Sequence, residues 1–278
     1  MATPVVENVQ TATSTSSGKS VTVTKPTGLA EDDLLWLYTM AYSGTDEVSL
    51  TTPSGWTASH SYTNLTDKKA YSFWKIADSS DVAASDFTFT WTSDESNIDE
   101  INATLMRVSN VSTAGPIRDS GSGTAAPNQS TPDFTVNVDP LVSDALYIVM
   151  YFGEDDSSVT SYEFDTTSPT FTQVANFSNA GDYRGTLAWA NAVDESVITT
   201  LTVNLDNNNP NNFGALVALS EQKSASATST TLELAPTLFT GAGSSGSTGT
   251  STTLDLAPTT FTGETYSGEK VWTTTPKS

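Results

Sequence analysis

Cysteine is absent from the 278 residues of this chain, and histidine occurs once, as His60. Without cysteine there is no disulfide framework, no thiol nucleophile and no thiolate metal ligand. A single imidazole also excludes any site that needs two. Basic residues are scarce: 11 Lys and Arg stand against 32 Asp and Glu. The resulting net charge of -21 argues against binding to the phosphates of nucleic acid.

Long apolar segments are missing as well. No run of about 18 apolar residues occurs, so the sequence predicts no membrane span. The start, Met1-Ala-Thr-Pro, has neither the basic segment nor the apolar core of a signal peptide. No segment shows a helical period of useful length. What is abundant is small hydroxyl side chains, 47 Thr and 37 Ser, a composition that favours β-structure.

Residues 1–222 carry the patterns of short β-strands. Residues 20–24 and the run Phe87, Phe89, Trp91 alternate apolar and polar side chains, which predicts half-buried strands. Residues 34–42 are continuously apolar and aromatic, which predicts a strand buried on both faces. Further strands are expected at residues 56–62, 70–77 and 101–108.

The same order of strands returns after residue 112. At offsets of 111 to 115 residues, the following segments align: 21–24 with 134–138, 33–41 with 144–152, 52–57 with 167–172, Trp74 with Trp189, 87–91 with 201–205, and 103–105 with 215–217. Residues 1–112 and 113–222 are therefore interpreted as two copies of one strand set. About seven strands per copy are typical of a β-sandwich. The copies either form separate sandwiches or share one double sandwich.

Residues 223–278 form a low-complexity arm rich in Ser, Thr and Gly. Within it, residues 228–241 recur as residues 250–263, with 12 of 14 positions identical. Composition alone favours a disordered linker, but a linker needs no repeated apolar anchors. We expect each repeat to contact a partner surface, with these residues as the contacts: Leu232, Leu234, Pro236, Phe239, Leu254, Leu256, Pro258 and Phe261.

Few residues are candidates for a catalytic, metal-binding or ligand-binding site. Ser72 and Lys75 have Ser-x-x-Lys spacing inside an alternating strand, which we interpret as chance, and His60 is expected to be a surface or rim residue and not a base. Acidic loops such as residues 94–100, 154–156 and 206–209 lack EF-hand spacing and read as solvated turns. No catalytic, cofactor-binding or metal-binding residue is predicted. Trp36, Trp74 and Trp91 are expected in the core, because their counterparts in the second copy are often other apolar residues. Tyr62 and Tyr71 stay as candidate glycan contacts.

Four motifs carry a resemblance to a known family: Pro26-Thr-Gly28 with Asp33-Leu-Leu35, Pro53-Ser-Gly-Trp-Thr57, Tyr71-Ser-Phe-Trp-Lys-Ile-Ala77, and Phe87-Thr-Phe89. Over residues 4–222 the chain resembles a family of tailed-phage virion structural proteins of β-sandwich type, found among tail, fibre and capsid-decorating proteins. The second copy departs from the pattern, because Ser168-Pro-Thr-Phe-Thr172 lacks the glycine before the aromatic residue. The motifs are turns and core residues, so the resemblance implies fold and virion context and no functional site.

The sequence thus predicts an all-β fold, an internally duplicated β-sandwich of jelly-roll or immunoglobulin-like type with an extended arm. The expected function is that of a non-enzymatic structural protein on the exterior of a phage particle, a capsid decoration protein whose arm contacts neighbouring subunits. Its expected partners are other virion proteins and copies of itself in a homotrimer or another symmetric oligomer. The alternatives are a tail or fibre protein, or a module that binds surface glycans.

Overall fold

The computed structural model describes residues 2–44, 46–94, 98–140, 145–154, 157–179 and 183–221. Two five-stranded antiparallel sheets form its centre. The first sheet has the strand order β1 (Val5–Gly18), β9 (Ile98–Ser109), β3 (Leu34–Tyr42), β6 (Lys68–Ile76) and β5 (Thr57–Tyr62). The second has the order β10 (Ile117–Thr124), β17 (Asn212–Leu219), β12 (Leu146–Gly153), β15 (Tyr183–Asn191) and β14 (Thr172–Asn179).

Smaller sheets cover the outer face of each large sheet. In the first half these are β2 (Ser20–Thr24) with β7 (Asp86–Thr90), and β4 (Val48–Ser49) with β8 (Thr92–Ser93). In the second half β11 (Asp133–Val138), β16 (Ile198–Leu205) and β13 (Val159–Phe164) form one sheet. The strand order of the first half thus returns in the second. The prediction of an internally duplicated all-β sandwich is confirmed.

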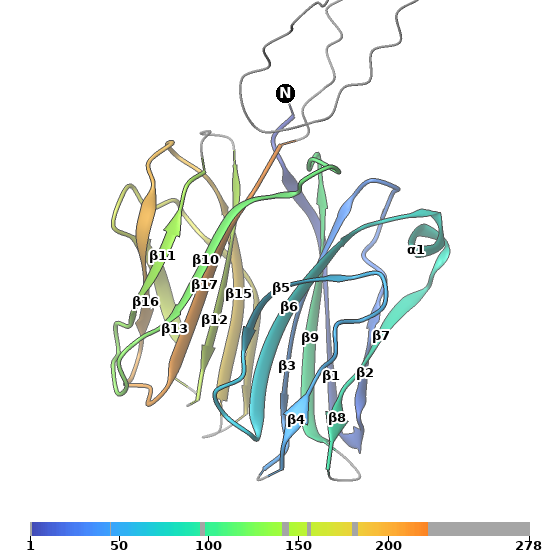
Figure 1. Ribbon diagram of the computed structural model, residues 1–278, viewed down its shortest axis with the longest axis horizontal. Coiled ribbons are helices and arrows are strands. Elements are labelled where there is room, and N and C mark those ends of the chain that lie inside the picture. Colours follow the sequence, from blue (N-terminus) through green and yellow to red (C-terminus); the bar gives the residue numbers. More distant parts are fainter. Residues whose placement is uncertain are drawn as a thin grey trace, which may run out of the picture. The chain divides into compact units, whose positions relative to one another are not determined.

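The two large sheets pack face to face, so the described body has four layers (Figure 1). One hydrophobic cluster joins both halves across this interface, and it includes Trp36 and Met40 from β3 with Ile148 and Phe152 from β12. Two further clusters fill the space between each large sheet and its outer layer. Residues 1–226 form one compact unit, so the two copies share their central core.

The two central strands β3 and β12 are buried on both faces, as the apolar run at residues 34–42 predicts. Alternate residues of β3 face different cores: Trp36 lies in the shared cluster, whereas Leu35 and Leu37 lie in the core of the first sandwich. A strand between two packed layers needs apolar side chains in both directions, which explains why the alternation is lost here. Trp36 and Trp91 are fully buried, as expected, whereas Trp74 is only partly buried and packs against the shared cluster.

Two blocks of the sequence alignment between the copies were wrong by one residue. Trp36 lies opposite Trp74 and Ile148 lies opposite Trp189, so Trp36 corresponds to Ile148 and not to Tyr147. Likewise, Val217 corresponds to Met106 and not to Leu105. A slip of one residue moves every side chain to the opposite face of a sheet. Where both faces are apolar, the sequence pattern carries no signal that would reveal the slip.

Five strands and one helical turn were missed, and the strands are β1, β4, β8, β10 and β13. β1 and β10 are rich in Ser, Thr and Gly, and β1 has a register shift between Val6 and Asn8 that breaks its alternation. The helix α1 (Ser79–Ala83) is a single turn with a capping box between Asp78 and Asp81. In the part of the chain that the structure describes, no helix is long and apolar enough to cross a membrane.

Replacing Phe152 by alanine tests the shared core. Its fully buried ring lies with its centroid 5.0 Å from that of Tyr62, across the interface. Phe152→Ala should reduce the free energy of unfolding by about 3–5 kcal/mol, measured by chemical denaturation. Val197→Ala, at a side chain that is 46% exposed, is the control and should change it by less than about 0.5 kcal/mol. A loss below about 1 kcal/mol for Phe152→Ala would mean that the halves do not depend on this interface.

Candidate functional site

The first motif of the family resemblance forms a turn that an ion pair holds in place. The Asp33 carboxylate is buried and accepts hydrogen bonds from Arg107 Nε at 2.6 Å and from the Ala30 N–H at 2.8 Å. Gly28 has a φ of 72°, and a Cβ there would lie 2.7 Å from Arg107 Nη1. Arg107 also donates to the Thr27 carbonyl at 3.2 Å. These residues fix the entry into β3, which is a structural role.

The second motif places an aromatic side chain over the edge of the sandwich. Gly55 takes a φ of 81°, and the Trp56 N–H then donates to the Pro53 carbonyl at 3.0 Å. The Trp56 ring packs edge-on against Phe87 and Phe89, with centroids 6.3 and 5.6 Å away. This indole therefore closes the side of the core.

The third motif also serves the fold. Lys75 Nζ donates to an Asp81 carboxylate oxygen at 2.7 Å, and both side chains are largely buried. The pair ties β6 to the helical turn α1. Ser72 points to the other side of β6, where its hydroxyl accepts the His60 N–H at 3.0 Å. The structure does not bring Ser72 and Lys75 together, so they do not form a catalytic pair.

Of the two tyrosines that were candidate glycan contacts, Tyr62 lies in the packed interior and Tyr71 is partly buried against the core of the first half. Tyr62 is buried in the shared core between Phe152 and Phe213, with ring centroids 5.0 and 5.7 Å away. Its ring cannot stack on a sugar in this position. Tyr71 is half-buried and lies 6.0 Å from Phe73 and 5.3 Å from Trp91. The reason is that both faces of the first large sheet are covered, so aromatic residues on either face become core residues.

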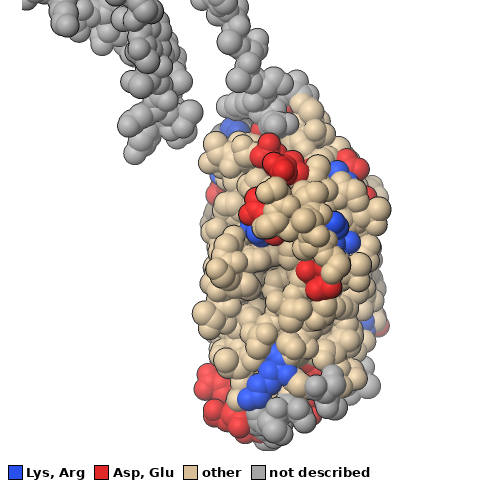
Figure 2. All heavy atoms as spheres, turned by 90° about the vertical axis from the view of Figure 1, so that its right-hand side faces the viewer, with Lys and Arg blue, Asp and Glu red and all other residues tan. Residues whose placement is uncertain are grey.

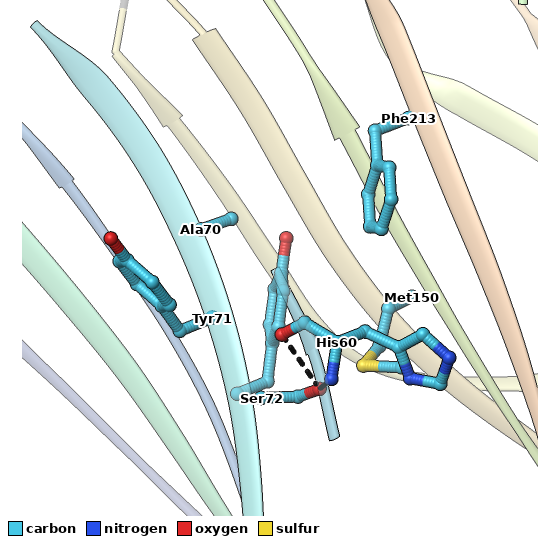
Figure 3. Close-up of a pocket in the computed structure, with 7 residues that line it drawn as sticks. His60, Ala70, Tyr71, Ser72, Met150 and Phe213 are labelled. Atoms are coloured by element: carbon cyan, nitrogen blue, oxygen red, sulfur yellow. Dashed lines mark hydrogen bonds between the residues drawn. The ribbon is translucent and has the colours of Figure 1, made fainter. Parts of the chain in front are cut away.

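His60 lies at the rim of a narrow gap between the two halves (Figure 3). The gap is lined by Tyr38, His60, Ala70, Tyr71, Ser72, Met150 and Phe213, and it is too small to admit a water molecule. His60 Nδ1 is 2.9 Å from the Ser59 hydroxyl, and the imidazole points away from Ser72. Burial lowers the pKa of His60 to about 4. The imidazole is therefore neutral at pH 7 and partly buried beside the gap.

Acidic residues are dispersed across the described residues. An open depression of about 220 Å³ is lined by Glu47, Ser49, Thr92, Ser93 and Asp94. Glu47 pairs with Lys69 Nζ at 3.0 Å, so one of its two carboxylates is already engaged. Nowhere in the described residues do three or more Asp, Glu or His side chains gather as a metal site would require. Parts of the acidic loops at residues 94–100 and 154–156 lie outside the described residues.

The outer faces of the body are rich in hydroxyl groups. On the β2–β7 layer, Thr22 and Thr88 lie opposite each other with their hydroxyl oxygens 2.8 Å apart. Figure 2 views this side of the molecule, where acidic side chains form separate patches with uncharged surface between them. This face is therefore not one continuous acidic field.

The body ends at a fixed point beside its own N-terminus. Glu221 forms an isolated bridge with Val111, and the Ser220 N–H donates to the Pro116 carbonyl at 2.8 Å. Asn110 Nδ2 donates to the Thr3 carbonyl at 3.3 Å, so the start of the chain lies at the same end (Figure 1). The eight predicted contact residues of the arm, from Leu232 to Phe261, lie outside the described residues.

Sequence reasoning missed the polar contacts inside the shared core. Tyr38 Oη donates to the Tyr151 carbonyl at 2.9 Å, and Asn102 Nδ2 donates to Tyr183 Oη at 2.6 Å. Both bonds cross from one half to the other, and burial raises the pKa of Tyr38. A polar residue within an apolar strand, such as Asn102 in β9, was the available signal.

Comparison with protein-family models gave no match for this chain, and neither did comparison with curated proteins or with solved structures.

The single histidine allows a direct test of its environment. His60 should titrate near pH 4 in an NMR experiment, with one imidazole signal in the spectrum. Because the unfolded chain binds a proton near pH 6.5 and the folded chain does not, stability should fall as the pH drops from about 6.5 to 4. Over this pH range the free energy of unfolding of His60→Gln should fall by roughly 2 kcal/mol less than that of the wild type. A measured pKa near 6.5 would place the ring in solvent.

Proposed function

We propose that this chain is a non-enzymatic structural protein on the exterior of a tailed-phage particle, a capsid decoration protein whose C-terminal arm contacts neighbouring subunits. The observation that carries the proposal is the way in which the arm leaves the body. The backbone is held at Ser220 and Glu221 by β-type hydrogen bonds, and 57 residues with two nearly identical repeats follow. A fixed exit point followed by repeated apolar anchors suits a displayed body with a binding arm.

The motifs of the family resemblance support this role through what they do in the fold. Gly28 and Asp33 fix a turn, Trp56 covers a core, and Lys75 anchors a helical turn. A resemblance carried by framework residues implies a shared framework. It supports a structural protein of the virion better than a shared reaction.

The shared core suits a protein that must stay folded outside the cell. Four layers with three hydrophobic clusters bury the large side chains of both halves within one unit. The uncharged hydroxyl pairs in the outer layer of the first half, Thr22 with Thr88 and Ser49 with Thr92, are compatible with display in solvent. The alternative of glycan recognition has lost Tyr62 as a contact, because this ring is buried.

Peptide mass spectrometry of purified source particles tests the proposal and its alternative. A capsid decoration protein should be present in hundreds of copies per particle, on the order of the number of lattice sites. A few to some tens of copies would instead place the chain on the tail or fibre. Absence from the particle would overturn the virion assignment.

Deletion of the arm tests its role as an anchor. A chain that ends at Ser226 keeps the whole compact unit, so its thermal unfolding midpoint should stay within a few degrees of wild type. Its incorporation into particles should fall at least about tenfold, because the contact energy resides in the repeats. The control is the full-length chain with Val197→Ala. Equal incorporation of the truncated and full-length chains would contradict the arm hypothesis.

A further inference from the structure

The outer edge of β1 differs from the other edges of the two large sheets. β5 and β14 each carry a register shift, between Ala58 and Ser61 and between Gln173 and Ala175. β10 has a register shift at its start and charged residues at 118 and 119. β1 has register shifts at both ends, between Val6 and Asn8 and between Thr15 and Gly18, but it pairs with β9 without interruption from residue 8 to residue 15, and this run contains no charged residue. Bulges and charges are the usual protection against pairing at an edge, and β1 lacks both over this run.

The direction of the backbone groups of β1 follows from the register. The Ala77 N–H donates to the Asp33 carbonyl, and the Ser43 N–H donates to the Asp67 carbonyl. These bonds continue the β3–β6 pairing at both ends, so odd-numbered residues of β3 bond to β6. Even-numbered residues of β3 must therefore bond to β9. Because the pairing of β3 with β9 joins even numbers to even numbers, the odd-numbered residues of β9 bond to β1.

The outward groups of β1 belong to its odd-numbered residues. Gln10 lies opposite Leu105 and Ala12 opposite Ala103, so these two residues bond to β9. The N–H and C=O groups of Val9, Thr11 and Thr13 then point away from the sheet. The described residues supply no hydrogen-bond partner for the main-chain groups of these three.

We propose that this edge of β1 accepts the arm repeat of a second copy of the chain as an added β-strand. The inference rests on the proposed function, in which the arm contacts neighbouring subunits. The repeat begins with Thr-Thr-Leu-Glu-Leu at residues 230–234, which has the alternation of a strand and is followed by Pro236. Residues 252–256 repeat it as Thr-Thr-Leu-Asp-Leu. The neutral run of β1 is a suitable partner for these acidic segments, because a charged edge of an acidic body would repel them.

The length of the linker before the first repeat and the direction in which it leaves the body favour a second copy as the source of the added strand. The arm leaves the body near the start of β1, as the contacts of Thr3 and Glu221 establish. Nine residues, 222–230, span at most about 30 Å. Antiparallel pairing is the commoner mode, and it would place residue 230 of the same chain opposite Thr13, about 26 Å along β1 from Val5. The linker of the first repeat would then have to run almost fully extended before the chain turns back, whereas the second repeat, which follows residues 222–251, is not limited in this way. A neighbour's arm can enter from the opposite end.

Cysteine cross-linking tests the contact in the full-length chain, which has no cysteine of its own. A chain carrying Thr11→Cys is mixed with a chain of different mass carrying Leu232→Cys, and the disulfide products are separated without reductant. The expected product is the mixed dimer, formed at least about tenfold faster than with Thr88→Cys, an exposed control on β7. Equal rates at Thr11→Cys and Thr88→Cys would overturn the proposal. If a chain bearing both cysteines forms an intrachain disulfide and no mixed dimer appears, the second-copy assignment is wrong.

A proline tests the backbone itself. Thr11→Pro removes an N–H that points away from β9, so the fold should persist while strand addition is blocked. The dissociation constant of the oligomer, measured by sedimentation, should rise at least about tenfold, whereas Thr11→Ala should leave it within threefold. Unchanged association of a folded Thr11→Pro chain would contradict the inference, and if this variant does not fold the cross-linking result decides. If cross-linking fails but deletion of the arm still abolishes incorporation, the arm binds another virion protein and the proposed function stands.

Discussion

The packing of the two five-stranded sheets against each other is the constraint on which the rest of the structure depends. Each large sheet is covered by an outer layer on one side and by the other large sheet on the second side. A half on its own would expose the face that carries Trp36 and Met40, or Ile148 and Phe152. The duplication therefore produced one folding unit from two copies, and the cost of separating them is the apolar area of a whole sheet face.

The interface is asymmetric although the two sheets have the same strand order. Counting back from the aligned Trp74 and Trp189, Gly185 of β15 corresponds to Ala70 of β6. A Cβ at Gly185 would lie 2.2 Å from Met40 Sδ. The second half has therefore lost a methyl group where the first half inserts a long side chain. Two identical faces could not have packed in this way, so the divergence of the copies is part of how they fit.

How much the sequence could predict depends on how many faces of a strand are buried. Strands with one apolar face, such as β2 and β7, have a period of two that can be read directly. The doubly buried β3 and β12 were found by their composition, but their alignment was wrong by one residue because neither face differs from the other. β1 was missed because a register shift interrupts a polar strand whose order comes from its hydrogen bonds to β9.

The same reasoning explains why the predictions were right for some candidate residues and wrong for others. Trp36 and Trp91 were placed in the core because the second copy has other apolar residues there, and this comparison needed no knowledge of the layers. Tyr62 was kept as a candidate glycan contact because an aromatic ring can stack on a sugar, and nothing in the first copy alone shows that this face is covered. Only the second sheet, which packs Phe152 against it, makes Tyr62 a core residue. The sequence of one copy alone therefore cannot show which of its residues contact the other copy.

The packing also determines where interaction chemistry is available on this protein. Within residues 2–221, as far as the structure describes them, the aromatic rings and His60 lie within or beside the cores, and Lys75 and Arg107 are engaged in ion pairs that hold turns. These side chains of the body are thus committed to the fold. A sheet edge is different, because its N–H and C=O groups exist whatever the side chains are. Of two equivalent edge strands, β10 has Arg118, Asp119 and two glycines, whereas β1 has an uncharged, uninterrupted run at residues 8–15. Binding through the backbone therefore needs a partner with strand-forming alternation, and the arm repeats of this same chain have it.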